Sequence, residues 1–275
     1  MVVPFCLASI WMAYKFVPTT APGGARAEQG SNLDWRGLLL GCVGTLCLLN
    51  GLVELRGGTA LEAGLLLAAA VASLLLFIWW QRRYAAQCGA PLMNLDLFNF
   101  RPFAMGSIVS VIYGTALFGS TYLLPVYMQQ ALQLSASHVG TILLPAGIVL
   151  AVTIAVVGRL ADKQPTWLLV SIGLALLAAS FALMWLVRLD SALWLLVALA
   201  VLGRIGLGFI LPSLNLGAMR PLHKHLIPQG SSAINFLRML GGATGVSLCG
   251  IVLEWRLAAH GDALTTLHSS PARLA

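Results

Sequence analysis

Two arginines, Arg204 and Arg238, lie near the middle of long apolar stretches of the sequence. A bare cation inside a membrane-spanning helix costs about 3 kcal/mol or more, so such a residue normally faces a polar cavity or a partner. An arginine in such a place can bind a substrate through its guanidinium group, or it can shift the proton affinity of a nearby carboxylate. The alternative is a structural arginine that snorkels or bonds to an adjacent helix. Asn235 and Asn215, in the same two regions, are further candidates for lining a cavity.

A third apolar stretch, residues 103–128, carries several tyrosines. Aromatic and amide side chains can line a promiscuous cavity for lipophilic cations, and Tyr113 is our candidate for that role. Tyr122 and Tyr127 stand nearer the end of the stretch. Tyrosines at the end of a span are typical of the interfacial aromatic belt, which we favour for these two.

Small residues accompany both arginines. Glycine has no side chain, so it lets neighbouring helices approach closely beside a charge. The string GRIGLG lacks the spacing of a dinucleotide-binding loop and no soluble strand precedes it, so we interpret it as helix packing. The glycines that we expect to pack helices are Gly206, Gly208, Gly241, Gly242 and Gly245.

A group of charges interrupts the apolar sequence in the string GRLADK. The residues of this loop signature are Gly158, Arg159, Asp162 and Lys163. We expect a tight cytoplasmic turn in which the basic residues lie at the level of lipid phosphates. Asp162 then caps the next helix or pairs with a neighbouring helix end. The alternative is an ordinary charged loop that only sets topology.

The composition identifies the kind of protein that holds these residues. The chain has 275 residues, of which 59% are hydrophobic and 9% charged, and its mean hydropathy is +0.89. A soluble domain has roughly 25% charged residues. We therefore expect an all-α polytopic membrane protein, since the alternating segments of a β-barrel are missing from the sequence. No motif of an intramembrane enzyme occurs.

Metal, disulfide and nucleic-acid chemistry find no support in the sequence. The five cysteines form no CxxC pair, and the histidines have no ligand-like spacing. The net charge of +7 comes from basic residues at the ends of apolar runs, not from one patch. We expect no cofactor, no metal site and no nucleic-acid partner.

Seven segments have the ~20 mainly apolar residues that a transmembrane helix needs. A shorter apolar segment, residues 1–17, is interpreted as part of a further helix, and residues 18–33 as a cytoplasmic linker rich in proline, glycine and alanine. The seven expected spans are about 36–55, 60–80, 103–128, 136–158, 166–187, 191–213 and 229–253.

The basic residues predict the orientation of these spans. If the end of the first segment at Lys15 is cytoplasmic, ten basic residues fall on that side and three on the other, as the positive-inside rule expects. The ten are Lys15, Arg26, Arg36, Arg82, Arg83, Arg101, Arg159, Lys163, Arg220 and Lys224. The three are Arg56, Arg188 and Arg256.

Several motifs in collinear order resemble one known family. They are GRLADK, PLMNLDLFNFRPFAMG, ALFGSTYLLPVYMQQALQLSASHVGTILLPAG, GRIGLGFILPSLN and QGSSAINFLRMLGGATGVSLCG. Together they are similar to the second half of the fourteen-span drug:proton antiporters of the major facilitator superfamily, over about residues 1–253. The resemblance implies a major-facilitator-like helix bundle with seven full spans and a partial N-terminal span.

The resemblance also implies a division of the chain. Residues 34–81 would be two extra linker spans, 82–102 a cytoplasmic amphipathic loop, 103–253 five helices of the C-terminal transporter domain, and 254–275 a polar tail. The family's N-terminal domain and last span have no counterpart here, so we expect the N-terminal domain as a missing partner. Other implied partners are the lipid bilayer, small amphipathic substrates, protons and a periplasmic adaptor.

The implied function is part of an inner-membrane efflux transporter that exports amphipathic drugs or toxic compounds by proton antiport. Between residues 103 and 253 the only carboxylates are Asp162 and Asp190, both in loops. Proton coupling needs an ionisable group within the membrane, so we expect the coupling carboxylates in the missing domain. The alternative is a non-transporting truncated remnant or an accessory membrane subunit.

Overall fold

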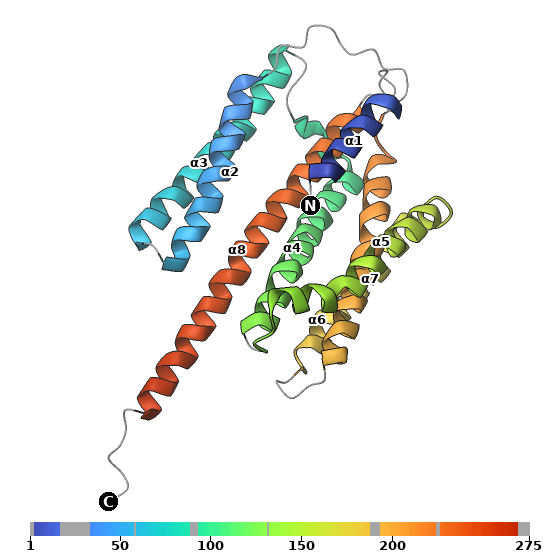
Figure 1. The fold of residues 1–275 in the computed structure, drawn as a ribbon. Coiled ribbons are helices and arrows are strands. Elements are labelled where there is room, and N and C mark those ends of the chain that lie inside the picture. The colour runs from blue at the N-terminus through green and yellow to red at the C-terminus, as the bar shows by residue number, and fades with distance from the viewer. Residues whose placement is uncertain are drawn as a thin grey trace, which may run out of the picture. The chain divides into compact units, whose positions relative to one another are not determined.

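The protein is an all-helical chain wherever the structure, a computed structural model, describes it. The described residues are 3–16, 34–57, 59–88, 93–130, 132–187, 193–223 and 226–268. In chain order the elements are α1 (Val3–Phe16), α2 (Trp35–Gly57), α3 (Ala60–Cys88), the short 3-10 helix η1 (Leu95–Asn99), α4 (Arg101–Gln130), α5 (Ala136–Ala161), α6 (Thr166–Met184), α7 (Leu193–Met219) and α8 (Ile227–His268) (Figure 1).

Seven of these helices, α2 to α8, are long and apolar enough to cross a membrane. This confirms the predicted number of full spans and the all-α membrane fold. The first helix, α1, has 14 residues, fewer than the ~20 of a full span. The chain divides into two units, residues 1–34 and residues 35–275.

Several helices extend further than the apolar sequence suggested. Helix α3 continues to Cys88, α7 to Met219 and α8 to His268, so part of the expected polar tail is helical. The reason is that hydropathy marks the lipid-embedded part of a helix, whereas backbone hydrogen bonds carry the helix on into polar residues. Residues 95–99, within the expected loop, form η1, which Asn94 caps by accepting the Asp96 N–H at 3.0 Å.

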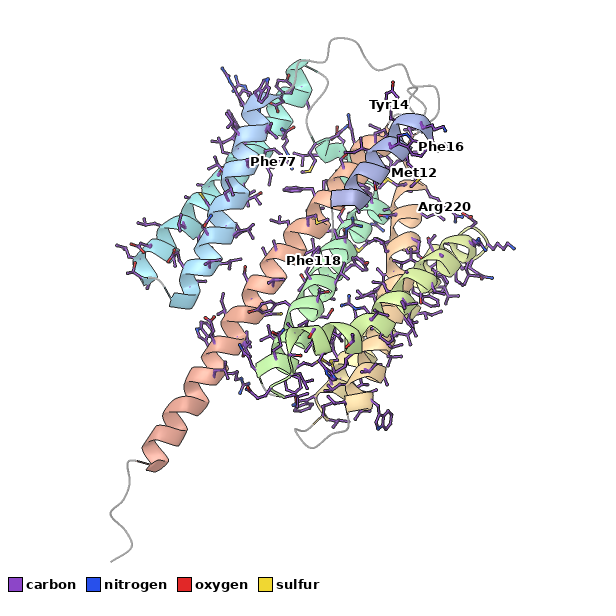
Figure 2. All side chains as sticks on the ribbon, in the orientation of Figure 1. Met12, Tyr14, Phe16, Phe77, Phe118 and Arg220 are labelled. Carbon is purple, nitrogen blue, oxygen red and sulfur yellow. The ribbon has the colours of Figure 1, made fainter. Side chains whose placement is uncertain are left out.

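The most extensive helix contacts join α4 with α8, α6 with α7, α2 with α3, and α5 with α7. Helices α4 and α8 run side by side in Figure 1. Many large apolar side chains project outward from the ribbon in Figure 2. On α5 the exposed Ile148, Val152 and Val156 recur every fourth residue and so form one stripe. A stripe of this kind is expected where a helix faces lipid instead of water.

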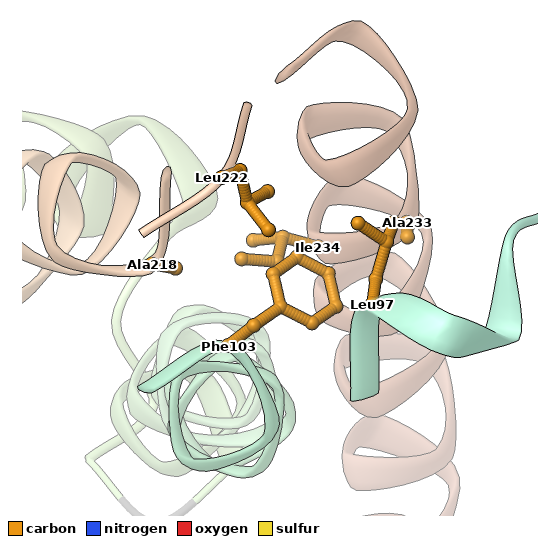
Figure 3. Packing of buried hydrophobic residues seen from close by; sticks show 6 residues of the cluster. All are labelled: Leu97, Phe103, Ala218, Leu222, Ala233 and Ile234. Carbon is orange, nitrogen blue, oxygen red and sulfur yellow. The ribbon is translucent and has the colours of Figure 1, made fainter. Parts of the chain in front are cut away.

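Buried side chains hold the ends of α4, α7 and α8 together. Phe103 of α4 is fully buried and lies between Leu97 of η1 and Ile234 of α8 (Figure 3). Leu222 and Ala218, at the end of α7, belong to the same cluster. A second cluster joins Tyr113 of α4 to apolar residues of α6 and α7. Together these contacts fix the three helices that carry the candidate site.

Candidate functional site

Helices α4 and α8 meet along a seam of small residues. A side chain at Gly241 would come within 2.5 Å of the Val111 carbonyl oxygen, and one at Gly245 within 2.7 Å of the Thr115 backbone. The Thr115 hydroxyl donates to the Gly241 carbonyl at 2.9 Å. Gly114 faces the Arg238 carbonyl, where even a methyl group would overlap the oxygen. Close backbone contact therefore fixes the turn of α8 that carries Arg238.

The seam has a second hydroxyl bond and a second packed glycine. The Ser110 hydroxyl of α4 donates to the carbonyl of Ile234 in α8 at 2.9 Å, and Ser110 is fully buried. Gly242 faces the ring of Phe118, so a side chain there would overlap the ring. These contacts link α4 and α8 over about two turns, which leaves α8 little freedom to rotate at this level.

Arg238 is half-buried and bonds within its own helix. Its Nη2 donates to the amide oxygen of Asn235, which lies three residues earlier on α8. Residues three apart are neighbours on a helix surface, so this bond needs no other element. The amide takes up one donor of the guanidinium, and the remaining N–H groups stay available to another partner.

Arg204, on α7, bonds across helices. Its Nη2 donates to the Thr121 hydroxyl oxygen of α4 at 3.0 Å. Neighbouring glycines bring α7 close to α6 and α5, because a side chain at Gly206 would meet the Gly173 carbonyl of α6 at 2.8 Å and one at Gly208 would meet Thr153 of α5 at 2.7 Å. The tight packing determines where the guanidinium can reach.

Tyr113 lies on α4 between the helices that carry the two arginines. It is buried, with 1% of its surface exposed, and belongs to the same cluster as Leu207, three residues after Arg204 on α7, while its neighbour Gly114 meets the Arg238 carbonyl of α8. Four predicted site residues, Arg204, Arg238, Tyr113 and Asn235, thus lie on three helices that pack together, α4, α7 and α8. With Thr121 they form what we call the arginine–tyrosine cluster. It offers two cations and several hydrogen-bond donors within the membrane-spanning helices, which suits binding of a polar group.

Asn215, the remaining candidate, does not join this cluster. It is exposed and follows Arg204 by eleven residues on α7. Eleven residues are three helical turns, so Asn215 lies on the same face of α7 but about 16 Å along the helix. The expectation that it lines the same cavity stays a prediction.

Sequence reasoning did not single out Thr121. Its position relative to Gly114 could have identified it. Thr121 follows Gly114 by seven residues, or two helical turns, and so lies on the same face of α4. Thr121 itself is exposed, and a hydroxyl on a span is a common partner for a polar group on the next helix. The spacing alone does not identify the helix that packs against α4 at Thr121. The bond from Arg204 depends on that helix being α7.

The packed side of Arg204 leaves little space. The cavity that Arg204 lines with Ser120 and Ser180 has a volume of about 10 Å³, which is room for at most one water molecule. The Ser180 hydroxyl is already bonded to the Leu199 carbonyl at 2.8 Å. A substrate would therefore have to approach the guanidinium from its exposed side.

The charged loop between α5 and α6 is exposed. Arg159 lies in the last turn of α5, and Lys163 and Gln164 donate backbone N–H groups to the Leu160 carbonyl at 3.0 and 2.9 Å. The residue that caps α6 is Pro165, without a side-chain bond. Of the two alternatives for Asp162, capping of the next helix is therefore wrong: Asp162 ends α5, and α6 begins only at Thr166, four residues later. Pairing of Asp162 with a neighbouring helix end stays a prediction.

Within the residues that the structure describes, no group of three histidine, cysteine, aspartate or glutamate side chains could hold a metal ion. Cys42, Cys47 and Cys249 are free thiols. Cys6 and Cys88 fall where side chains are not described.

Comparisons with known proteins agree with this architecture. Residues 1–246 match the model of the Major Facilitator Superfamily. The chain is 26% identical over 273 residues to a "Multidrug resistance protein B homolog" of Mycobacterium tuberculosis, covering 96% of this chain and 48% of the relative. It is 31% identical over 176 residues to the "Lincomycin resistance protein LmrB" of Listeria innocua, covering 63% of this chain and 36% of that relative.

A third relative is the "Multidrug transporter protein MdtP" of Bacillus subtilis, 26% identical over 166 residues, with 60% of this chain and 31% of the relative covered. The chain thus spans about half or less of the length of these relatives. The superfamily comprises membrane transporters, so the match points away from an enzyme. Because its model matches most of the residues and the seven spans fit its helical fold, the chain belongs to the Major Facilitator Superfamily.

Proposed function

We propose that this chain forms part of a drug efflux transporter of the bacterial cell membrane, one that exports amphipathic compounds in exchange for protons. The observation that carries the proposal is the arginine–tyrosine cluster, which has two arginines inside the spanning helices, one bonded to Thr121 of α4 and the other to Asn235 of its own helix. The printed names of the relatives, which include multidrug and lincomycin resistance proteins, support the drug as substrate.

In this proposal the cluster binds the polar part of the substrate. The N–H groups of Arg238 that Asn235 does not bond and the exposed side of Arg204 donate to it, while the buried Tyr113 packs against α6 and α7 and holds the helices in place. The proton is carried elsewhere, because the segment from residue 103 to 253 has carboxylates only at Asp162 and Asp190, which the sequence places between apolar stretches. Transport then requires a second half of the transporter, with which this half encloses the substrate.

A chimera tests the proposal. The chain replaces the aligned half of the Mycobacterium tuberculosis relative, and efflux of a lipophilic dye is measured in cells that lack other pumps. We expect efflux that stops when the proton gradient is collapsed and that falls about tenfold in Arg238→Gln, as the loss of one charged hydrogen bond predicts. The matched control is Arg220→Gln, which removes an exposed arginine beyond the end of α7.

The chain alone, in liposomes with an imposed pH gradient, is the second arm, and we expect no dye movement there. A chimera that inserts normally but never moves dye would contradict the proposal and favour the accessory or non-transporting alternative. Dye movement by the chain alone, abolished in Arg238→Gln, would show that the two-half requirement is wrong.

The membrane orientation is part of the proposal and has its own test. The bias of basic residues puts the loop at Lys163 and the end of α3 at Arg82 in the cytoplasm. A single cysteine introduced at Gln164, in a chain whose five native cysteines are replaced, should react with an impermeant thiol reagent only after the cells are opened. Labelling in intact cells would reverse the orientation.

A further inference from the structure

A groove of about 620 Å³ lies between α2, α3 and α8. On α2 its lining positions run from Leu38 to Leu46 at spacings of three and four residues, which is one face of a helix. Phe77 of α3 forms another wall, and Figure 2 labels it on that helix. Ala233 and Phe236 line the groove from α8. A volume of this size lies within the ~300–1,000 Å³ of typical ligand sites.

The groove is apolar. None of the described residues that line it is charged. The Thr45 hydroxyl donates to the Gly41 carbonyl of its own helix at 2.8 Å and so does not need a ligand. An occupant with a charge in the groove would lose its hydration without gaining a partner, which excludes ions and strongly polar molecules. The lining therefore fits a hydrocarbon chain.

The surroundings of the groove supply such a chain. The walls from α2 and α8 lie in segments that are apolar enough to span a membrane, residues 35–55 and 227–257. A lateral opening at this depth faces lipid tails, not water. An empty volume would forfeit the dispersion contacts of all the side chains around it, which favours an apolar occupant.

Three arginines stand at the end of the helices that bear the groove. Arg36 is two residues before Leu38 on α2, and its guanidinium carbon lies 5.3 Å from the centre of the Trp80 ring. Arg83 is similarly placed over Trp79 at 5.4 Å, and Arg82 is exposed beside it. Arg36 lies at the start of α2 and Arg82 and Arg83 lie near the end of α3, so these three residues place three positive charges there.

A hydrogen bond joins this basic end to the groove. The Gln81 side chain, adjacent to Arg82, is buried and accepts the backbone N–H of Met93 at 3.4 Å. Met93 itself lines the groove. Tryptophan rings beside arginines are typical of the level of lipid headgroups, where an aromatic ring and a cation both find partners. The apolar groove and the positive charges therefore adjoin each other.

We propose that this groove binds a phospholipid with an anionic headgroup. One acyl chain lies along α2 against Phe77 and Phe236, and the phosphate is held by Arg36, Arg82 and Arg83. The charge pattern selects an anionic lipid over a zwitterionic one, because basic clusters at the end of spans attract negative headgroups. Binding at this site does not require the transport cycle, so the inference stands or falls separately from the proposed function.

Native mass spectrometry of the purified full chain tests the inference, with phosphatidylglycerol and phosphatidylcholine of identical acyl chains in equal amounts. We expect phosphatidylglycerol to be retained roughly tenfold more tightly. Replacing Arg36, Arg82 and Arg83 with glutamine should abolish the preference. The matched control removes three exposed charges elsewhere, by glutamine at Arg159, Lys163 and Arg220, and should keep it.

A second pair of variants tests the groove itself. Cys42→Trp places a large ring in the groove and should release both lipids, whereas Val43→Trp adds the same ring at the neighbouring exposed position, outside the lining, and should not. Leu46→Trp, which also lines the groove, replaces Cys42→Trp if that variant does not elute like the parent chain. Size-exclusion elution reports folding for every variant.

Three outcomes would overturn the inference. One is equal retention of the two lipids. Another is lipid retention that Cys42→Trp and Leu46→Trp leave unchanged. The third is a dimer that disappears in these variants while lipid binding persists, which would make a second copy of the chain the occupant of the groove.

Discussion

Helix α8 contacts two neighbours in different ways. Against α4 its glycines touch backbone, and hydroxyl groups of Ser110 and Thr115 bond to its carbonyls. Towards α2 it borders the apolar groove, and there Thr45 bonds only within its own helix. The difference shows that small and hydroxylated residues have different structural roles in different parts of a span. They hold two helices together where the backbones are in contact, and they line an open groove where the helices are further apart.

Gly114 and Gly41 show this contrast at single positions. A side chain at Gly114 would overlap the Arg238 carbonyl, whereas one at Gly41 would only touch the Phe77 ring at an ordinary distance of 3.6 Å. Sequence cannot tell these glycines apart, since each lies in an apolar helix. Substitutions at the two sites should therefore have very different effects.

The largest effect is expected at the α4–α8 seam. Gly114→Ala should lower the free energy of unfolding by about 1–3 kcal/mol, because the methyl group meets a backbone oxygen that no side-chain movement can displace. Chemical unfolding of the purified chain in detergent measures it. Gly147→Ala is the control, since a side chain there meets nothing within 4 Å. Equal stability of the two variants would mean that the seam is not closely packed.

A smaller effect is expected for the bond between Arg204 and Thr121, which joins α7 to α4 at 3.0 Å. A double-mutant cycle with Arg204→Gln and Thr121→Val should give a coupling energy of about 0.6 kcal/mol, the average for hydrogen bonds between membrane helices. The cycle with Arg238→Gln in place of Arg204→Gln serves as the control. Coupling of Thr121 to Arg238 instead would contradict the observed pairing.

At the groove, a substitution should weaken lipid binding without lowering the stability of the protein. Gly41→Val should change the free energy of unfolding by no more than about 0.5 kcal/mol, because the side chain enters open space, yet it should weaken retention of phosphatidylglycerol. Gly64→Val, at a glycine of α3 with nothing within 4 Å and outside the groove, should do neither. A large loss of stability in Gly41→Val alone would show that the groove is closed by packing.

The smallest effect on stability is expected in the loop. Asp162 is exposed and ends α5 without a side-chain partner among the residues described, so Asp162→Asn should alter unfolding by less than about 0.5 kcal/mol. In the chimera it should nevertheless reduce dye efflux, and Lys163→Gln should reduce it less. Normal efflux in Asp162→Asn would leave the loop with a topological role only.

Much of the fold could be predicted because the bilayer imposes a simple condition. Each span needs about 20 apolar residues, and all seven expected spans are found as helices. The ends were less predictable, as α8 shows by continuing to His268. Helix propensity and local hydrogen bonds decide an end, and neither is visible in hydropathy.

The candidate site was predictable as a set of residues but not as an arrangement. Arg204 and Arg238 stand out because a cation in a span is costly. The burial of Tyr113 against α6 and α7 and the pairing of Arg204 with Thr121 both depend on which helices adjoin. The failed prediction that Asp162 caps α6 has a similar origin, since it depended on the path of a tight turn.

Sequence alone thus determined the class of the protein, the number of its spans and the residues whose charge is out of place in lipid. These follow from the free energy of moving each residue from water to hydrocarbon, which is a local property. Only the tertiary structure decided that Gly114 is packed and Gly41 is not, that Arg204 bonds to Thr121 of α4, and that a groove lies beside α8. These depend on the approach of helices far apart in the chain, which hydrophobicity does not direct once every helix is already surrounded by lipid.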